Sequence, residues 1–197
     1  MNKEFSPRNL KNAAWVVIPT RLTTAVLFNF CRDIERVFRL NPYLKIISWR
    51  ERNANKYEIE LENYSNEQVI EVSAQIKVEE LQNELQLNYS SGIKNKTYFI
   101  VEETDRGAQL MIVDDYGESN QQVVEQVDKS LSAWGNALER FFAAYKLVRH
   151  FPWADKIINR WWIRLNPSGR RIIYILMVIT AIELLALLLF VILYWWL

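Results

Sequence analysis

The chain has 197 residues, a formal net charge of +1, one cysteine and one histidine. One cysteine excludes an internal disulfide, and one Cys with one His is too few ligands for a zinc site. With His150 as its only histidine and neither a GxxxxGK[ST] loop nor a GxGxxG motif, the sequence predicts no metal, no cofactor, no nucleotide and no enzymatic triad.

The N-terminal part begins without a secretory signal, because its apolar stretch AAWVVI is short and is interrupted by Pro19. We therefore expect a domain that is not exported, beginning with a strand over AAWVVIP. From Thr20 to about Phe38, apolar residues return every three or four positions and predict one or two short helices that end at LNPYL. Cys31 lies among them and is expected to be a small buried hydrophobe in a reducing compartment.

A run of strands follows these helices. Apolar and polar residues alternate over 57–61, 70–78 and 85–89, which predicts antiparallel strands with one wet and one dry face. TYFIVEETD and AQLMIVDDY flank the turn DRG and are apolar on both faces, as is typical of central strands covered by a helix. The acidic pairs Glu102-Glu103 and Asp114-Asp115 are predicted to be solvated hairpin ends, because neighbours in a strand point to opposite faces.

One long helix is predicted after Ser119. Its apolar residues step by three and four without a miss: Val124, Val127, Leu131, Trp134, Leu138, Phe141, Tyr145 and Val148. Nearly thirty residues at about 1.5 Å each give a helix of about 40 Å, long enough to cross a whole sheet.

This order of elements resembles the START-like, or SRPBCC, helix-grip family. The resemblance covers about Ala13 to Leu147 and is carried by AAWVVIPTRLTTAVLFNFCRDIERVFRLNP, TYFIVEETDRGAQLMIVDDYG and VDKSLSAWGNALERFFAAYK. It implies an α+β fold in which a curved antiparallel sheet surrounds a long C-terminal helix and leaves an apolar cavity. In many relatives that cavity holds a lipid, sterol, polyketide or quinone, and some, such as coenzyme Q-binding proteins, act at membranes without catalysis.

Candidate residues for lining such a cavity lie on the predicted strands and on the long helix. They are Tyr57, Ile59, Tyr98, Ile100, Met111, Val113, Trp134, Leu138, Phe141 and Phe142. An aromatic stripe at helical spacing is also what a solid core contains, so simple packing at each position remains an alternative.

The segment 151–169 is basic and rich in tryptophan. Trp153, Ile157, Trp161 and Leu165 recur every four residues, as do Lys156, Arg160 and Arg164, which predicts a helix lying in the headgroup layer before Asn166-Pro167-Ser168-Gly169 interrupts it. Its position beside an apolar run favours anionic lipid over nucleic acid as its partner. The predicted membrane-interface residues are Trp153, Lys156, Arg160, Trp161, Arg164, Arg170 and Arg171.

The C-terminal run Ile172 to Leu197 is 26 residues long, and its only ionisable side chains are Glu183 and two tyrosines. It exceeds the about 20 residues that span a bilayer core, so a single transmembrane helix is predicted. Residues 1–145 carry a net charge of −4, residues 146–171 carry +6, and no cation follows the run. These charges predict a cytoplasmic domain anchored in the inner membrane, with boundaries at 1–150, 151–169 and 170–197.

Glu183 falls near the middle of the predicted span, where an ionised carboxylate is costly. Thr180, Glu183 and Ala186 share a face that fits another helix, so this face is predicted to dock onto another membrane subunit or a second copy, with Tyr194 as a further candidate. Two alternatives remain open: a neutral Glu183 that faces lipid, and a proton relay.

Three functions are therefore open at this stage. The protein is either a non-enzymatic carrier or chaperone for a lipid, quinone or isoprenoid, or an accessory subunit of a membrane complex with a filled cavity. An aromatase or cyclase is the third possibility, and it requires polar groups that converge in the pocket.

Overall fold

The computed structural model describes residues 12–66, 68–117, 130–148 and 162–196. In chain order its elements are β1 (Ala13–Pro19), α1 (Thr24–Arg32), α2 (Ile34–Arg39), β2 (Leu44–Asn53), β3 (Lys56–Asn63), β4 (Ile70–Leu81), β5 (Glu84–Tyr89), β6 (Lys96–Thr104), β7 (Gly107–Asp115), α4 (Ser130–Val148) and α6 (Pro167–Trp196). The predicted order of one strand, two short helices, a meander and a closing helix is confirmed.

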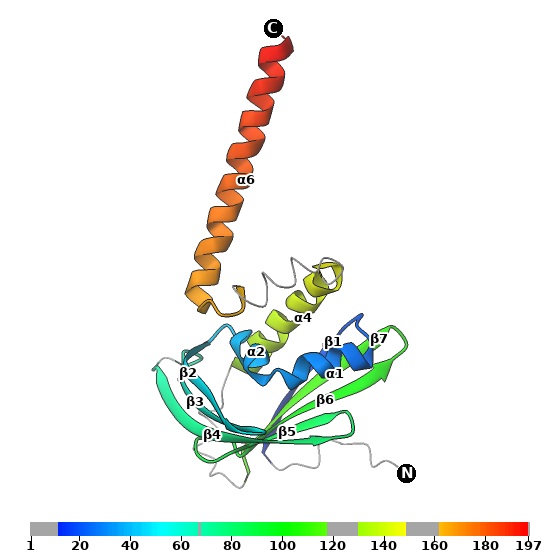
Figure 1. Ribbon diagram of the computed structural model, residues 1–197, viewed down its shortest axis with the longest axis vertical. Helices are drawn as coiled ribbons and strands as arrows, with labels where there is room; N and C mark the ends of the chain where they lie inside the picture. Colours follow the sequence, from blue (N-terminus) through cyan, green and yellow to red (C-terminus); the bar gives the residue numbers. More distant parts are fainter. Residues whose placement is uncertain (1–11, 67, 118–129, 149–161, 197) are drawn as a thin grey trace.

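The seven strands form one antiparallel sheet with the order β1-β7-β6-β5-β4-β3-β2. The first strand pairs with the last, so β1 and β2 are the edges. Figure 1 shows the sheet curving beneath α1, α2 and α4. The β2–β3 pairing shifts register twice, between Ile46 and Ser48 and between Glu51 and Asn53, and such irregularities bend and twist an edge strand.

The main core lies between the inner face of this sheet and the three helices. Leu131, Trp134 and Leu138 of the predicted stripe are buried, whereas the next buried residue is Phe142 and the predicted Phe141 and Tyr145 are half-buried. The Trp134 ring meets Phe38 and Phe99 edge-on, at centroid distances of 5.5 and 5.9 Å. The covering helix is thus confirmed over 130–148, whereas Val124 and Val127 lie outside the described residues.

Gly135 sets how closely α4 approaches the edge strand β1. A Cβ atom at this position would lie 2.6 Å from Cγ2 of Val16, which is closer than real contacts allow. Glycine in a helix interior costs roughly 0.5–1 kcal/mol relative to alanine, so close packing against β1 is the physical reason for it.

The short helices α1 and α2 cover the inner face beside α4. Cys31 is fully buried there, and burial raises the pKa of its thiol far above the ordinary value, as expected for a structural rather than a reactive cysteine. The Arg36 guanidinium lies over the rings of Phe30 and Tyr145, at 4.4 and 5.0 Å from their centroids. These cation–π contacts tie α2 to the C-terminal half of α4.

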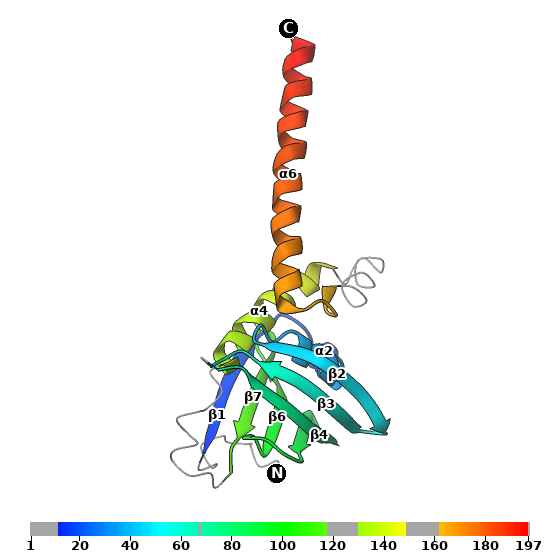
Figure 2. The same cartoon turned by 90° about the vertical axis from the view of Figure 1, so that its left-hand side faces the viewer.

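The last helix, α6, extends away from the domain, and none of its residues is buried (Figure 2). It is 30 residues long and apolar enough to cross a membrane by length and composition. It begins at Pro167, three residues before the predicted boundary at 170. Proline suits the first position of a helix, because the N–H that it lacks has no intrahelical partner there.

Candidate functional site

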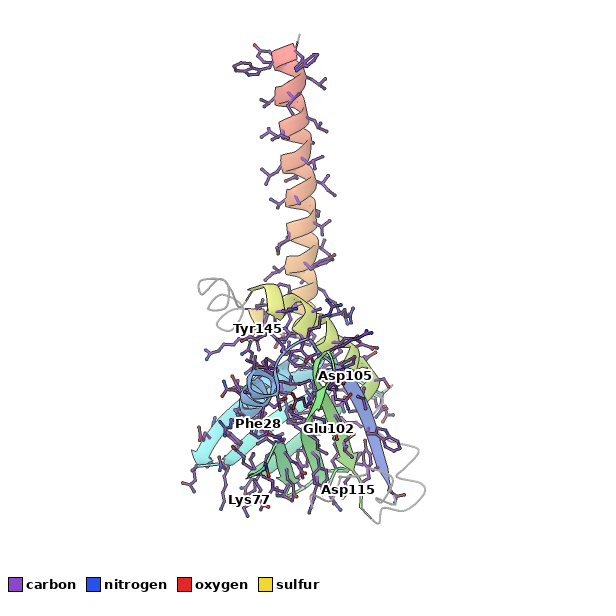
Figure 3. All side chains as sticks on the ribbon, turned by 90° about the vertical axis from the view of Figure 1, so that its right-hand side faces the viewer. Phe28, Lys77, Glu102, Asp105, Asp115 and Tyr145 are labelled. Atoms are coloured by element: carbon purple, nitrogen blue, oxygen red, sulfur yellow. The ribbon has the colours of Figure 1, made fainter. Side chains whose placement is uncertain are left out.

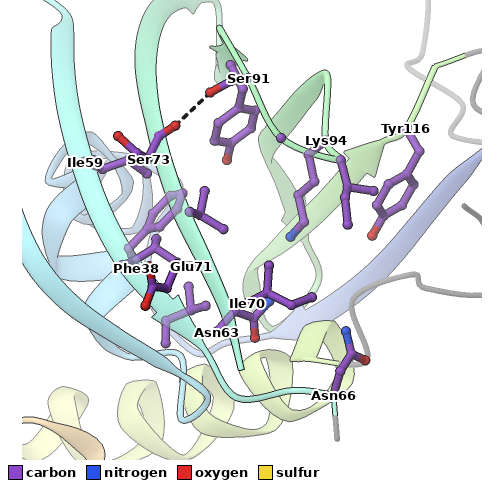
Figure 4. Close-up of a pocket in the computed structure, with 16 residues that line it drawn as sticks. Phe38, Ile59, Asn63, Asn66, Ile70, Glu71, Ser73, Ser91, Lys94 and Tyr116 are labelled. Atoms are coloured by element: carbon purple, nitrogen blue, oxygen red, sulfur yellow. Dashed lines mark hydrogen bonds between the residues drawn. The ribbon is translucent and has the colours of Figure 1, made fainter. Parts of the chain in front are cut away.

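A cavity of about 280 Å³ opens on the inner side of the sheet, where β3 and β4 meet the 90–95 connection (Figure 4). We call it the inner cavity. Its apolar lining is Phe38, Leu44, Ile59, Leu61, Ile70, Val72 and Ile93. Its remaining lining is Asn63, Asn66, Glu71, Ser73, Tyr89, Ser91, Gly92, Lys94 and Tyr116.

The polar end of the inner cavity rests on a fully buried carboxylate, Asp114. Lys94 Nζ donates to Asp114 Oδ2 at 2.8 Å, and Thr97 Oγ1 donates to Asp114 Oδ1 at 2.5 Å. Tyr89 Oη in turn donates to Thr97 Oγ1 at 3.0 Å. A buried charge needs such partners to offset its desolvation. The prediction of a solvated hairpin end is therefore wrong for Asp114.

Of the predicted pocket residues, Ile59 lines the inner cavity, whereas four others lie on the opposite face of the sheet. Tyr98, Ile100, Met111 and Val113 form a separate buried cluster with Ala13. Phe99, between two of them, meets Trp134 on the inner face. Because neighbours in a strand point to opposite faces, these four residues cannot share a cavity with Trp134, and their predicted role is wrong.

The remaining predicted residues belong to the solid core. Trp134, Leu138 and Phe142 are fully or almost fully buried and lie outside the lining of the inner cavity. Phe141 is half-buried and stacks on Tyr145, with ring centroids 5.5 Å apart.

Tyr57 is half-buried against Trp49 rather than in the inner cavity, with ring centroids 5.6 Å apart. Burial raises the pKa of its hydroxyl, with smaller contributions from Glu51 and Asp33. Simple packing, the alternative left open by the sequence, therefore applies to Tyr57 and to the four helix positions predicted to line the cavity, Trp134, Leu138, Phe141 and Phe142.

The polar lining was not found from the sequence. Asn66 and Lys94 lie in connections, where no periodicity tells which side chains point inward. The only available signal is the stretch SSGIKNK between two predicted strands, which is longer than a tight hairpin turn requires.

The predicted membrane-interface residues have different positions. Trp153, Lys156, Arg160 and Trp161 lie outside the described residues, and Arg164 is exposed.

The described end of the predicted interfacial segment folds onto the domain. Ile163 is buried in the main core, and Trp162 packs against that core. Residues 163–165 form a turn and a bend, and Asn166 has no regular structure. The predicted helix is therefore wrong for 163–165, where Ile163 packs into the core of the domain.

Arg170 joins the base of α6 to the domain. Its guanidinium donates to the carbonyl of Arg39 at the end of α2, to that of Ile163 at 3.1 Å and to that of Leu165 at 3.0 Å. A cation also suits the C-terminal end of α2, where unpaired carbonyls gather. Arg170 therefore holds the start of α6 against the domain. These contacts do not support its predicted role as a headgroup ligand.

A second cavity, the junction cleft, lies between the base of α6 and the domain and has a volume of about 580 Å³. Its lining comprises Pro42, Tyr43, Lys45, Tyr64, Leu165, Asn166, Pro167, Ser168, Gly169 and Arg171. The inner cavity and the junction cleft share their strands. Leu44 and Asn63 line the inner cavity, whereas their neighbours Lys45 and Tyr64 line the junction cleft.

Charge in the junction cleft is partly compensated. Lys45 Nζ lies 3.0 Å from Glu62 Oε2, and Tyr64 Oη donates to the same carboxylate. The hydrogen bond from Tyr64, followed by the one from Lys45, holds the pKa of Glu62 below its ordinary value.

The predicted docking face of α6 is open. Thr180, Glu183 and Ala186 are all exposed, and no described part of the chain covers them. Any partner for this face must therefore come from outside the described residues.

The sequence matches no family model and no curated protein. Among solved structures, it is similar to protein NE0264 from Nitrosomonas europaea, with 8% identity, a TM-score of 0.51 and coverage of 71% of this chain and 97% of that one. TTHA0849 from Thermus thermophilus is 10% identical over 67% of this chain and 96% of its own, with a TM-score of 0.49. The di-domain ARO/CYC StfQ from the steffimycin biosynthetic pathway is 11% identical over 73% of this chain and 54% of its own, also with a TM-score of 0.49.

These comparisons bear on the fold alone. The likeness to the Nitrosomonas protein agrees with the seven-stranded antiparallel sheet that curves around α4. The chain has an α+β helix-grip fold followed by one long apolar helix.

Proposed function

We propose that this protein is a membrane-anchored, non-enzymatic binding protein for a hydrophobic ligand such as a lipid, quinone or isoprenoid. The observation that carries the proposal is an inner cavity with one apolar wall and one polar end, in a domain joined to an unburied apolar helix. We further propose membership of the START-like, or SRPBCC, family, on the basis of the order of elements and the helix-grip fold.

The size of the inner cavity limits the ligand. Its volume of about 280 Å³ is close to the lower end of the range of roughly 300–1,000 Å³ for small-molecule sites. This favours a ring system or a short chain over a complete two-chain lipid. The polar groups of Ser91 and Lys94, both in the 90–95 connection, suit a ligand with one polar end (Figure 4).

Binding rather than catalysis is favoured by how the polar groups are used. Asp114 is held by Lys94 and Thr97, so its carboxylate stabilises the end of the cavity.

The ligand is tested by filling the inner cavity. Val72 lines it, faces Leu61 on the neighbouring strand and is half-buried, so Val72→Phe places a ring in the open space. We expect the amount of hydrophobic molecule that co-purifies with the full-length protein in mild detergent to fall about tenfold, which corresponds to about 1.4 kcal/mol of binding free energy. Mass spectrometry of the organic extract measures it.

Val69→Phe is the matched control, because Val69 is 50% exposed and lies outside the cavity. The amount of hydrophobic molecule that co-purifies with Val69→Phe should equal the amount that co-purifies with the unchanged protein. Equal amounts of co-purifying hydrophobic molecule from Val72→Phe and Val69→Phe would contradict ligand binding in the inner cavity.

The proposed topology places the domain in the cytoplasm and the C-terminus outside the inner membrane. It rests on the cluster of cations that precedes Ile172 in the sequence. In spheroplasts, we expect external protease to remove a C-terminal tag and to leave an N-terminal tag intact. The reverse pattern would contradict this orientation.

A second candidate function is that of an accessory subunit in a membrane complex. The exposed face of Thr180, Glu183 and Ala186 favours it, because a carboxylate near the middle of a span needs a partner. The two functions are compatible, since the cavity and the docking face lie on different parts of the chain.

A further inference from the structure

We propose that the junction cleft binds the headgroup phosphate of an anionic phospholipid. The inference deepens the proposed function and rests on the insertion of α6 into a bilayer. It assigns lipid recognition to a preformed cleft between the anchor and the domain.

The depth of the cleft matches the headgroup layer. Arg171 directly precedes Ile172, the first residue of the apolar run, and Pro167 lies four residues before Arg171. At 1.5 Å per residue, these positions cover about 6 Å along the helix. The headgroup region on each side of a bilayer is about 5–7 Å thick, so the part of α6 that lines the cleft lies at the level of the phosphates.

The charge of the cleft suits one anion. Arg171 is exposed, and no ion pair or hydrogen bond joins its side chain to another described residue. Lys45 is already paired with Glu62, so the three groups together carry one net positive charge. A planar guanidinium binds two phosphate oxygens at once, which makes Arg171 the principal ligand and Lys45 a secondary one.

The other walls also suit the interface. Tyr43 and Tyr64 line the cleft and remain 37% and 44% exposed. Tyrosine is enriched at the boundary of water and hydrocarbon, because its ring is apolar and its hydroxyl is polar. Ser168 adds a hydroxyl donor from α6 itself.

The cleft is held in shape by Arg170. Its contacts with the carbonyls of Arg39, Ile163 and Leu165 fix the start of α6 against α2. Tyr43 and Lys45 follow shortly after α2, so both walls are anchored to the same point. A preformed site loses less conformational freedom when it binds a lipid.

The test is native mass spectrometry of the full-length protein in mild non-ionic detergent, with phosphatidylglycerol or phosphatidylcholine added. We expect one phosphatidylglycerol to be retained in clear excess over phosphatidylcholine. Arg171→Gln should lower that retention about fivefold, the effect of removing one basic residue at an anionic membrane surface. Arg171→Lys should keep part of it, because the charge remains while the two-pronged geometry is lost.

Lys77→Gln is the charge-matched control, since it also removes one exposed cation, and Lys77 lies at the end of the domain far from α6 (Figure 3). Its lipid retention should be unchanged. Equal retention of both lipids, or an unchanged Arg171→Gln protein, would overturn the proposal, as would displacement of the lipid by millimolar inorganic phosphate. Alkaline extraction of membranes tests insertion separately, so a failure of the anchor is distinguished from a failure of the site.

Discussion

Trp134→Ala is expected to lower the free energy of unfolding by about 3–5 kcal/mol, the range for removing a large aromatic side chain from a core. Trp134 is 2% exposed and touches the rings of Phe38 and Phe99. Its indole N–H also donates to the carbonyl of Val37 at 3.0 Å, which joins α4 to α2. Alanine would leave a void and would remove one of the two donors to the Val37 carbonyl, which also accepts from the N–H of Leu40.

Thermal or urea unfolding of the full-length protein in mild detergent, followed by near-ultraviolet circular dichroism, measures this change. Trp134→Phe should cost less than Trp134→Ala, because it keeps most of the apolar volume and loses only the N–H donor. Trp15→Ala is the control, since Trp15 is 46% exposed on the outer face of β1. A Trp134→Ala protein as stable as the Trp15→Ala protein would contradict the assignment of Trp134 to the core.

The order of elements was predictable because local patterns carry it. The alternation of 57–61 and 70–78 and the three- and four-residue steps of the closing helix each recur in the structure as β3, β4 and α4. The strand β2 was not identified individually. Its sequence LKIISWRERN begins at Leu44, the last residue of LNPYL, and its pairing with β3 is irregular, so its alternation is weak.

The cavity was less predictable, for a reason specific to β6 and β7. Both strands are apolar on both faces, so the pattern does not say which set of alternate residues faces α4. The prediction placed Tyr98 and Ile100 on the inner face and left out Phe99, so it exchanged the inner and outer faces of β6. Only the three-dimensional pairing shows that Phe99 meets Trp134.

The contacts of Arg170 with the domain and the buried ion pair between Lys94 and Asp114 join residues that are far apart in the sequence, so no local pattern contains them. Arg170 binds the carbonyl of Arg39, which lies 131 positions earlier in the chain. The prediction that Asp114 is solvated rested on its acidic neighbour Asp115. Its partner Lys94 lies in the connection between β5 and β6, 20 positions earlier in the chain. Arg170 was expected at the membrane interface and Asp114 in solvent, and the fold instead supplies each with partners inside the protein.

Glu183→Leu is expected to leave membrane insertion intact or improved and to release a partner of the anchor. Glu183 lies 11 residues past Ile172, which places it about 16 Å into a hydrocarbon core of about 30 Å. A charged acid at that depth costs about 2.5–3.5 kcal/mol on insertion scales, so leucine removes a penalty. Within the described chain, no cation or hydrogen-bond partner reaches Glu183, so we propose a docked helix as the source of compensation, with protonation of Glu183 as the alternative.

The size of the effect follows from the strength of hydrogen bonds between membrane helices. Such bonds contribute about 1–2 kcal/mol in model peptides, so co-purification of the partner should fall roughly five- to thirtyfold. Glu183→Gln should keep most of the complex, because an amide still forms hydrogen bonds without a charge. Leu185→Ala changes the opposite side of the helix, at a residue that is 63% exposed, and should keep all of it. An unchanged complex in Glu183→Leu would instead favour a neutral Glu183 that faces lipid, because the docking face would then contribute no measurable binding.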